Sequence, residues 1–415
     1  MSLIAMNSLA PPLITLFLLQ FFPLSCNSSE THFIENQTRT SPYPSISELV
    51  LAGKSHLSRN SSQLVPAFFI LGDSSVDVGT NNGLLSLAQS VLRPYGRDFD
   101  THMPTGRFCN GRLIVDYLAL RLGLPFIPPY LGTRRHVQDM IHGVNYASAG
   151  GGILSSSGKE LGERISFTQQ IQQAKYTFEK MVLSFGENAA KMLISNSLFL
   201  ISIGSNDYIH YFMDNVWHVQ SIYFPWEFNQ LLVRGVKREL QSLYDCNVRN
   251  VVVMGLAPLG CAPHYLSKYD SQNGECVELI NGMIVQYNYL MRHMVQKFSK
   301  ENPTANIIFC DLYEGATDIL RNRDRYGFET ITEACCGFGK YKGLAMCFFS
   351  SWACNNASNY VWWDKYHPTD AVNSILADNV WSSQHSNICY PMNLKDMLQK
   401  SSSSPVYISG NMNGW

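Results

Sequence analysis

The sequence predicts an α/β fold with one doubly wound, parallel sheet of five strands. From residue 65 onward, short apolar runs rich in β-branched or aromatic residues alternate with amphipathic segments. Such runs are typical of strands buried on both faces, and the alternation favours a parallel sheet. The predicted strands are residues 65–73, 142–150, 197–207, 248–258 and 305–313. The helix candidates between them are residues 113–123, 167–182, 228–245 and 278–300.

Residues 1–26 have the pattern of a signal peptide. An uncharged apolar stretch at residues 9–26 is followed by a polar segment, as in a leader that is removed after export. An uncleaved signal anchor is the alternative, but three prolines interrupt the stretch, which is short for a membrane span. We therefore expect cleavage near Cys26 and no stable membrane anchor in the mature protein.

Residues 27–64 are predicted to form a solvated, glycosylated N-terminal extension outside the fold. The segment is polar and contains three Asn-x-Ser/Thr acceptor sequences for N-glycosylation, and a fourth lies further along the chain. The four predicted acceptors are Asn27, Asn36, Asn60 and Asn356. Together with the leader, they indicate a secreted, extracellular protein.

Composition and charge argue against nucleic acid as a partner. The chain has 415 residues, of which 46% are hydrophobic, and a formal net charge of -1. Lys and Arg are scattered without long runs, so the sequence lacks the basic footprint of a nucleic-acid-binding protein and has no polybasic membrane patch. No linker divides the body, although the length alone permits more than one domain. The oligomeric state is left open.

The cysteines favour disulfides. Ten of the eleven remain after the predicted cleavage, and an even number in a secreted chain suggests pairing. Cys261 and Cys276 bracket one loop-like stretch, and a second such stretch contains Cys335, Cys336, Cys347 and Cys354. A zinc site is the rival interpretation, but these spacings include no CxxC pair, so we expect no metal. The spacing leaves the connectivity open.

Four clusters of small and polar residues point to the carboxyl edge of the sheet, where open α/β sheets bind ligands. Three lie at the ends of the first three predicted strands, and the fourth precedes an amphipathic helix. In chain order they are Gly72-Asp73-Ser74, Ala149 to Gly152, Gly204 to Asp207, and Asp364 with His367. Each alone is explained as well by a turn or a helix cap. Their order and their places at strand ends favour one catalytic site.

These clusters contain the groups that nucleophilic catalysis on an acyl carbonyl needs. A serine hydroxyl needs a base to take its proton, and an imidazole base needs an acceptor that fixes its tautomer. Ser74, His367 and Asp364 fit these three roles. The oxyanion that forms needs fixed donors. The Ser74 N–H, the N–H of a glycine in the second cluster and the Asn206 amide fit that need.

The set of clusters resembles the GDSL esterase/lipase group of the SGNH hydrolase superfamily, in the form common in plants. The matching blocks are FILGDSSVDVGTNN (69–82), GVNYASAGGGI (143–153), ISIGSND (201–207) and WWDKYHPTDAVN (362–373). The resemblance covers residues 65–395 and implies a three-layer α/β/α sandwich with a mostly parallel, five-stranded, flavodoxin-like sheet. The remaining residues, 396–415, are expected to be a disordered tail.

The resemblance also implies hydrolysis of carboxylic esters without a cofactor. Ser74 is then the nucleophile, His367 the base and Asp364 its partner, while Gly150 and Asn206 are the oxyanion donors. Gly150 is favoured over the two glycines after it because it completes the family pattern Asn-x-Ala-x-x-Gly. An α/β-hydrolase of the nucleophile-elbow type is disfavoured, because the chain contains no Gly-x-Ser-x-Gly.

The first block departs from the family at one position. It contains Gly-Asp-Ser-Ser where the family has Gly-Asp-Ser-Leu, so a small polar residue, Ser75, follows the predicted nucleophile. We expect Ser75 to cap backbone N–H groups of a following helix and Asp77 to hold the loop after Ser74. Trp362 and Trp363 are expected to pack rather than to contact substrate.

These observations favour a secreted serine esterase that acts on acyl or acetyl esters through an acyl-enzyme intermediate. An acyltransferase would use the same residues and differ only in the acceptor, on which the sequence is silent. A non-catalytic binding protein on the same scaffold would be indicated by loss of a catalytic position, and none is lost. The substrate, a lipid, polyester or small-molecule ester, is left open because the loops that form an acyl pocket vary freely.

Overall fold

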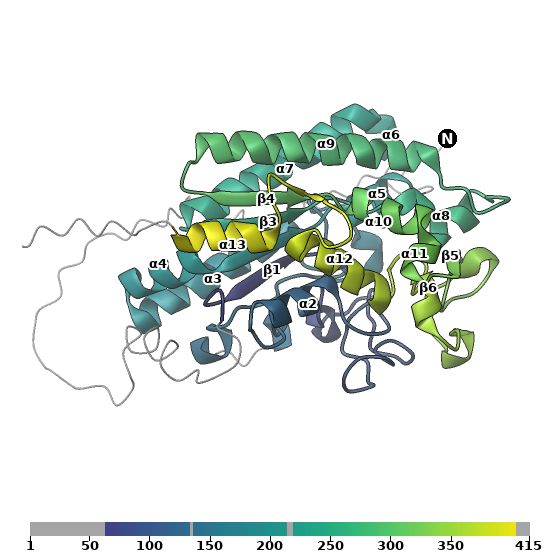
Figure 1. Cartoon of the computed structure of the whole chain (residues 1–415), viewed down its shortest axis with the longest axis horizontal. Helices are drawn as coiled ribbons and strands as arrows, with labels where there is room; N and C mark the ends of the chain where they lie inside the picture. Colours follow the sequence, from purple (N-terminus) through teal and green to yellow (C-terminus); the bar gives the residue numbers. More distant parts are fainter. Residues whose placement is uncertain (1–62, 133–135, 214–218, 404–415) are drawn as a thin grey trace, which may run out of the picture. The chain divides into compact units, whose positions relative to one another are not determined.

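A computed structural model of the chain describes residues 63–132, 136–213 and 219–403 (Figure 1). The predicted leader and three of the four predicted glycosylation acceptors lie outside these residues, as does Cys26. In the described part of the chain, the predicted α/β fold is confirmed, with helices on both sides of a mostly parallel sheet.

Five strands form the main sheet in the order β1-β2-β3-β4-β7. Strands β1 to β4 run parallel, and β7 is antiparallel to β4. Nearly every residue of the parallel strands is buried, which explains their apolar runs in the sequence. Four of the five predicted strands are confirmed. The strand bounds are Phe68–Gly72 (β1), Leu198–Ser202 (β2), Asn250–Met254 (β3), Asn306–Cys310 (β4) and Cys389–Tyr390 (β7).

The prediction of a regular strand at residues 142–150 is wrong. The segment does run beside β1, where Phe68 N donates to His142 O at 3.0 Å. Gly143, however, has a φ of +113°, outside the strand region, and a Cβ there would lie 1.9 Å from Phe68 O. The close approach to β1 therefore requires glycine and interrupts the strand, and β7 is the fifth strand instead.

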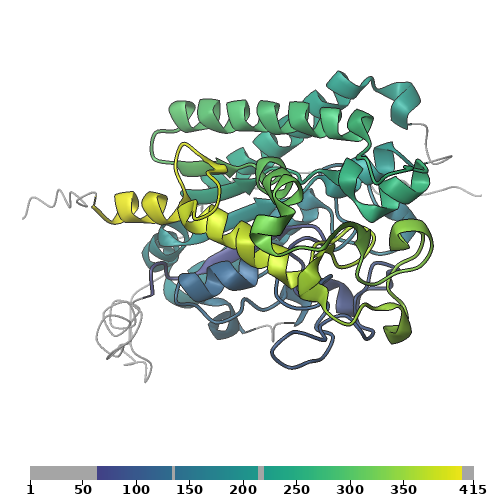
Figure 2. The ribbon, with the colours of Figure 1, turned by 45° about the vertical axis from the view of Figure 1, so that its right-hand side comes forward.

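Two groups of helices cover the two faces of the sheet (Figures 1 and 2). One group contains α3 (Phe167–Phe185), α7 (Pro225–Asp245) and α9 (Glu278–Glu301). The other contains α2 (Ile114–Arg121), α10 (Leu312–Arg321), α12 (Asp370–Ser382) and α13 (Leu394–Ser403). All four helices predicted between the strands are confirmed, as α2, α3, α7 and α9, and α12 follows His367 as predicted.

Shorter elements connect these layers. They are α4 (Glu187–Asn196), α5 (Ser205–Tyr211), α6 (Val219–Ile222), α8 (Pro263–Lys268), α11 (Arg323–Tyr326) and a small parallel sheet of β5 (Thr330–Ala334) with β6 (Tyr360–Trp362). Among the described residues, no helix combines the length and the hydropathy that a membrane span needs.

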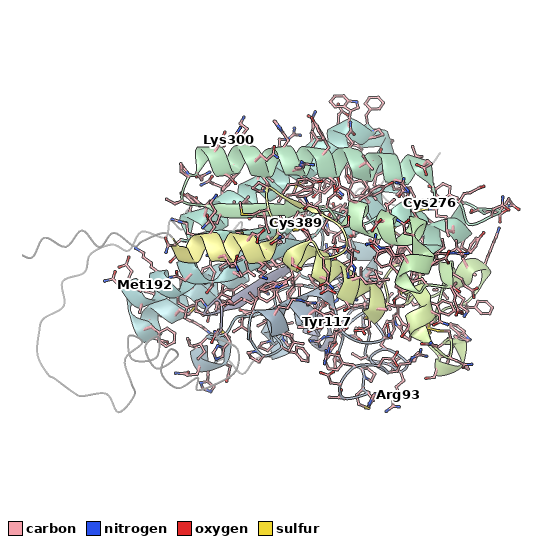
Figure 3. The ribbon with its side chains drawn as sticks, viewed as in Figure 1. Arg93, Tyr117, Met192, Cys276, Lys300 and Cys389 are labelled. Atoms are coloured by element: carbon pink, nitrogen blue, oxygen red, sulfur yellow. A yellow bond between two sulfur atoms is a disulfide. The ribbon has the colours of Figure 1, made fainter. Side chains whose placement is uncertain are left out.

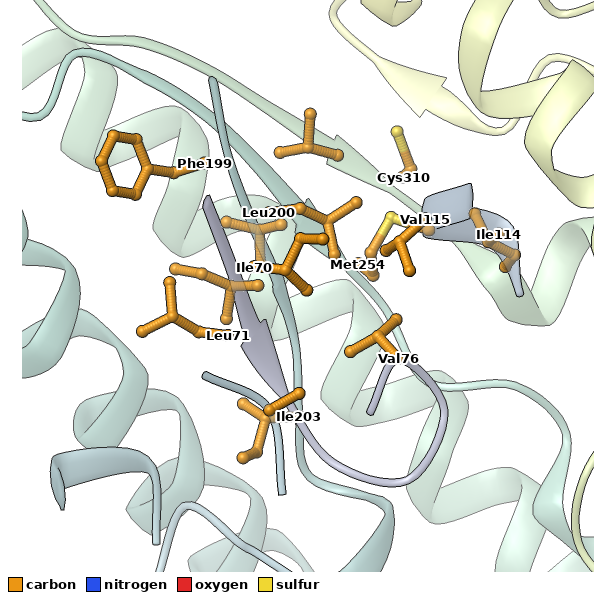
Figure 4. Packing of buried hydrophobic residues seen from close by; sticks show 14 of the residues in the cluster. Ile70, Leu71, Val76, Ile114, Val115, Phe199, Leu200, Ile203, Met254 and Cys310 are labelled. Atoms are coloured by element: carbon orange, nitrogen blue, oxygen red, sulfur yellow. The ribbon is translucent and has the colours of Figure 1, made fainter. Parts of the chain in front are cut away.

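The central strands present alternate side chains to the two helix layers (Figure 4). Phe199 of β2 packs toward α3, where its ring lies 5.9 Å from that of Phe178. Leu200, the next residue, faces the opposite layer, on the same side as Ile114 of α2. Because side chains alternate along a strand, Ser202 at the end of β2 lies on the Leu200 side. This face of the sheet leads to the candidate site.

Four disulfides lie in the described residues, as the cysteine count favours. They are Cys261–Cys276, Cys310–Cys389, Cys335–Cys354 and Cys336–Cys347. The second joins β4 to β7, where Cys389 is labelled in Figure 3. Cys109 is a buried free thiol, so the even number of cysteines does not mean that all ten pair.

The boundary predicted for the C-terminal tail requires a correction. Helix α13 continues to Ser403, so residues 396–403 are helical rather than disordered. Leu394, Met397 and Leu398 are buried, and the helix packs on α12 and β4. This apolar spacing anchors the helix to the domain. Residues 404–415 lie outside the described part.

Gln170 of α3 fixes the end of β1. Its Oε1 accepts from Gly72 N at 2.8 Å, and its Nε2 donates to Gly72 O at 2.8 Å and to Ile165 O at 3.0 Å. Gln170 and Gly72 are both buried, so water cannot take the place of either partner in these bonds. One side chain thus positions the residue from which the Asp73-Ser74 turn begins.

Gln170→Ala is expected to lower the free energy of unfolding by about 1–3 kcal/mol or more, because it leaves the buried Gly72 N–H without its acceptor. Gln172→Ala, on the exposed face of the same helix, is the matched control and should change stability by less than about 0.5 kcal/mol. Urea unfolding of both variants measures the difference. Equal stability of the two variants would contradict the role of Gln170.

Candidate active site

Ser74 lies in a tight turn directly after β1. Val76 N and Asp77 N both donate to Asp73 O, at 3.2 and 3.0 Å, and close the turn around Ser74. Gly72 permits this path, because a Cβ there would lie 2.3 Å from Ser202 O of the neighbouring strand. The turn leaves the half-buried Ser74 side chain on the wall of a cavity.

His367 connects Ser74 to Asp364. His367 Nε2 lies 2.8 Å from Ser74 Oγ, and Nδ1 lies 2.8 and 2.9 Å from the two oxygens of Asp364. Asp364 and His367 come from the segment between β6 and α12, far along the chain from Ser74. The structure thus brings the three predicted residues into one hydrogen-bonded series, in which Asp364 can orient the ring and Nε2 can accept the serine proton.

Asp364 is a fully buried carboxylate with several donors. Tyr366 N and His367 N each donate to Oδ1 at 2.9 Å, and Tyr95 OH donates to Oδ2 at 2.7 Å. Burial by itself raises the pKa of Asp364, but His367 and these donors outweigh it and lower the pKa below its usual range. Asp364 therefore remains an anion at neutral pH.

Tyr95 is a residue of the site that the sequence did not reveal. It comes from the loop between β1 and α2, and its ring packs edge-on against Trp363 with 6.0 Å between centroids. Trp363 is buried, as expected for a packing residue, whereas Trp362 also lines the cavity. No local motif marks Tyr95, because its partner lies 269 residues away.

The three predicted oxyanion donors come from three separate loops. Ser74 N and Gly150 N have no hydrogen-bond partner among the residues that the structure describes. Gly150 has a φ of +80° in a turn closed by Gly151 N and Ser148 O, a conformation that favours glycine. Asn206 Nδ2 donates to Gly151 O at 2.9 Å, which uses one of its two amide hydrogens. All three groups line the cavity at Ser74.

Asp77 holds the loop after Ser74, as predicted, and also joins it to the glycine turn. Its Oδ1 accepts from Gly79 N at 2.8 Å and Thr80 N at 2.7 Å, and its Oδ2 accepts from Ala149 N at 3.0 Å. Burial raises the pKa of Asp77 to about 6 even though these donors oppose the shift. The carboxylate is therefore ionised at neutral pH, where it fixes Ser74 relative to Gly150.

Asp207 has the same function on the next loop. Its carboxylate accepts from Ile153 N at 2.8 Å, Leu154 N at 2.9 Å and Ser157 Oγ at 2.8 Å. Burial raises its pKa to about 6. The bonds connect the start of α5, which carries Asn206, to the segment that follows the glycine cluster. From the sequence alone, Asp207 is only one member of a cluster that a helix cap would explain.

The prediction that Ser75 caps a helix is wrong. Its hydroxyl lies 2.7 Å from Asp73 Oδ1 and 3.0 Å from Ser202 Oγ, and its N–H also donates to Asp73 Oδ1. Burial raises the pKa of the Asp73 carboxyl, and the Ser75 hydroxyl bonds to this carboxyl and to Ser202 rather than to a helix N-terminus. Ser75 therefore faces β2 rather than His367, which leaves Ser74 as the serine on the imidazole.

The cavity at Ser74 has a volume of 640 Å³. Polar groups of the site form one part of its wall, and apolar side chains from the sheet and from α2, α10 and α12 form much of the rest. The described residues contain no group of three or more His, Cys, Asp or Glu side chains that could hold a metal ion. Asn356, the one described glycosylation acceptor, is exposed.

The fold and this site define an SGNH-type hydrolase scaffold, and comparison with known proteins identifies the family. The model of the GDSL-like lipase/acylhydrolase family matches residues 68–380. A GDSL esterase/lipase of Arabidopsis thaliana is 40% identical over 352 residues, which cover 84% of this chain and 91% of that protein. GDSL esterase/lipase 7 of the same plant is 38% identical over 356 residues, or 85% and 97% of the two chains. The chain belongs to the GDSL-like lipase/acylhydrolase family.

Asp77→Asn tests how burial acts on this carboxyl. With a pKa of about 6 when folded against an ordinary value of 3.8, the folded protein retains a proton that the unfolded chain has lost between these pH values. The stability of the wild type relative to the variant should therefore fall by about 3 kcal/mol as the pH rises from about 4 to 6, and stay level above about 7. Urea unfolding across this range measures the difference, and a difference independent of pH would contradict the raised pKa.

Proposed function

We propose that the protein hydrolyses carboxylic esters through an acyl-enzyme intermediate on Ser74. The observation that carries the proposal is the 2.8 Å contact between His367 Nε2 and Ser74 Oγ, with Asp364 on the opposite ring nitrogen. A family whose members include proteins named esterase/lipases supports an ester as the substrate.

In the first half of the reaction, Ser74 Oγ attacks the ester carbonyl carbon while its proton passes to His367 Nε2. The bond from that carbon to the alcohol oxygen then breaks, and Nε2 gives the proton to the departing alcohol. In the second half, a water molecule attacks the acyl carbon and loses a proton to Nε2. The carbon–Oγ bond breaks, the acid leaves and Ser74 regains its proton. Asp364 stabilises the imidazolium in both halves.

The negative charge that develops on the carbonyl oxygen needs donors that are already in place. Ser74 N–H, Gly150 N–H and the second amide hydrogen of Asn206 serve this purpose in the proposal. Asp77 and Asp207 hold the loops that carry these donors, so little reorganisation is required when the charge forms.

We also infer that the mature protein is secreted and N-glycosylated. The apolar leader pattern and the acceptor sequences at Asn27, Asn36 and Asn60 support export. The exposed acceptor at Asn356 and the four disulfides are compatible with an oxidising compartment.

Ser74→Ala is expected to reduce kcat to near the background rate, a loss that is on the order of 10⁶-fold in comparable triads. Ser75→Ala should stay active, because its hydroxyl bonds to Asp73 rather than to His367. Turnover of p-nitrophenyl esters and peptide mapping after treatment with an organophosphonate measure both effects. A phosphonyl group on Ser75, or full activity of Ser74→Ala, would overturn the assignment.

Asn206→Ala is expected to lower kcat by on the order of 10² to 10³ with little change in KM, because the amide acts mainly where charge develops. Asn196→Ala, at an exposed position on α4, is the matched control. Steady-state kinetics of the two variants decide the point. If a folded Asn206→Ala variant kept the kcat of the control, Asn206 would not belong to the oxyanion site.

Mass analysis of the protein recovered from the medium of a plant or yeast secretion host tests the proposed export. We expect a chain that begins near residue 27, loses mass on glycosidase treatment and gains eight reactive thiols on reduction, from the four disulfides. Retention of the leader, or the presence of these thiols before reduction, would contradict the proposal.

A further inference from the structure

Part of the wall of the cavity at Ser74 consists of apolar side chains, and the space beside them is the apolar arm of the cavity. The arm lies between the β2–β3 face that carries Leu200 and Met254 and the helices of the opposite layer. From those helices it is lined by Ile114 of α2, Leu312, Ala316 and Ile319 of α10, and Leu376 of α12. These side chains offer almost no hydrogen-bonding groups, so the arm suits an apolar guest.

Ser75 lies where the arm meets the site. It is the neighbour of Ser74 in the chain, and its hydroxyl contacts Ser202 Oγ at 3.0 Å. Ser202 is two residues beyond Leu200 on the same strand and therefore on the same face of the sheet. All four of these residues line the same cavity, in which Ser75 follows Ser74 in the chain and contacts the strand that carries Leu200.

The small size of Ser75 leaves this junction open. The family motif has leucine at this position, and a leucine side chain would extend beyond the serine hydroxyl into the same cavity wall. The Ser75 hydroxyl is already engaged by Asp73 and Ser202, so it does not demand a polar guest. A chain of methylene groups could therefore pass Ser75 without breaking a hydrogen bond to water.

We propose that Ser75 opens this arm to the acyl chain of the substrate and makes the protein selective for esters with extended aliphatic acyl groups. The proposal rests on the proposed ester hydrolysis, because it takes the acyl carbon to be bonded to Ser74 Oγ. Acetyl esters would leave the arm unfilled, and bulky polar acyl groups would bury polar atoms without partners there. Each added methylene should raise kcat/KM up to roughly fourfold until the arm is filled.

The test compares kcat/KM for p-nitrophenyl acetate, butyrate, octanoate and laurate in the wild type and three variants. For the wild type we expect the ratio of octanoate to acetate to be well above one. Ser75→Leu should lower this ratio at least about tenfold, because leucine fills the junction, whereas Ser75→Ala should retain it. Ala316→Leu narrows the arm away from Ser74 and should also lower the ratio, which keeps the test valid if Ser75→Leu does not fold.

The outcomes separate the two proposals. If folded Ser75→Leu and Ala316→Leu variants retain the wild-type ratio, or if the wild type prefers acetate to octanoate, the acyl-arm inference is overturned while ester hydrolysis stands. If the wild type hydrolyses none of the four esters and an organophosphonate also fails to label Ser74, the proposed function is overturned and the inference with it. A lowered ratio in both leucine variants, together with a retained ratio in Ser75→Ala, supports the assignment.

Discussion

Two buried carboxylates, those of Asp77 and Asp207, hold together the loops on which the site depends. Asp77 joins the loop after Ser74 to Ala149, next to Gly150, and Asp207 joins the start of α5 to the segment that follows the glycine cluster. Each accepts three hydrogen bonds, and a buried carboxylate that loses its donors is costly. The three loops are therefore fixed relative to one another before a substrate binds.

The rest of the site uses this fixed frame. Gln170 holds the end of β1 through its bonds to Gly72. Asp364 orients the His367 ring through Nδ1, the ring nitrogen that does not face Ser74. The proposed nucleophile, base and oxyanion donors thus come from four chain segments but have little freedom to move apart. Such preorganisation is the main way in which a protein stabilises charge that appears only during a reaction. The proposed acyl arm beside Ser75 lies next to this frame, and the Ser75 hydroxyl keeps its own bond to Ser202.

The sequence predicted the elements whose pattern is local, and missed those that depend on distant contacts. Apolar runs predicted four strands and the flanking helices, and short motifs predicted Ser74, Asp364 and His367. The segment at 142–150 appears as a strand because it is apolar, but Gly143 breaks its backbone. The two-residue strand β7 is too short to show a strand pattern in the sequence. The disulfide that joins it to β4 links two cysteines that are 79 residues apart in the chain. No sequence motif identifies Tyr95, because only folding brings it next to Asp364.

A crystal structure of the protein after reaction with an alkylphosphonate ester measures directly whether the two carboxylates preorganise an oxyanion site, because the phosphoryl oxygen stands in for the oxyanion. We expect phosphorus bonded to Ser74 Oγ and the phosphoryl oxygen within about 3 Å of Ser74 N, Gly150 N and Asn206 Nδ2 together. A phosphoryl oxygen that points away from these three groups, while Asp77 and Asp207 keep their bonds, would contradict the claim that the two carboxylates preorganise an oxyanion site.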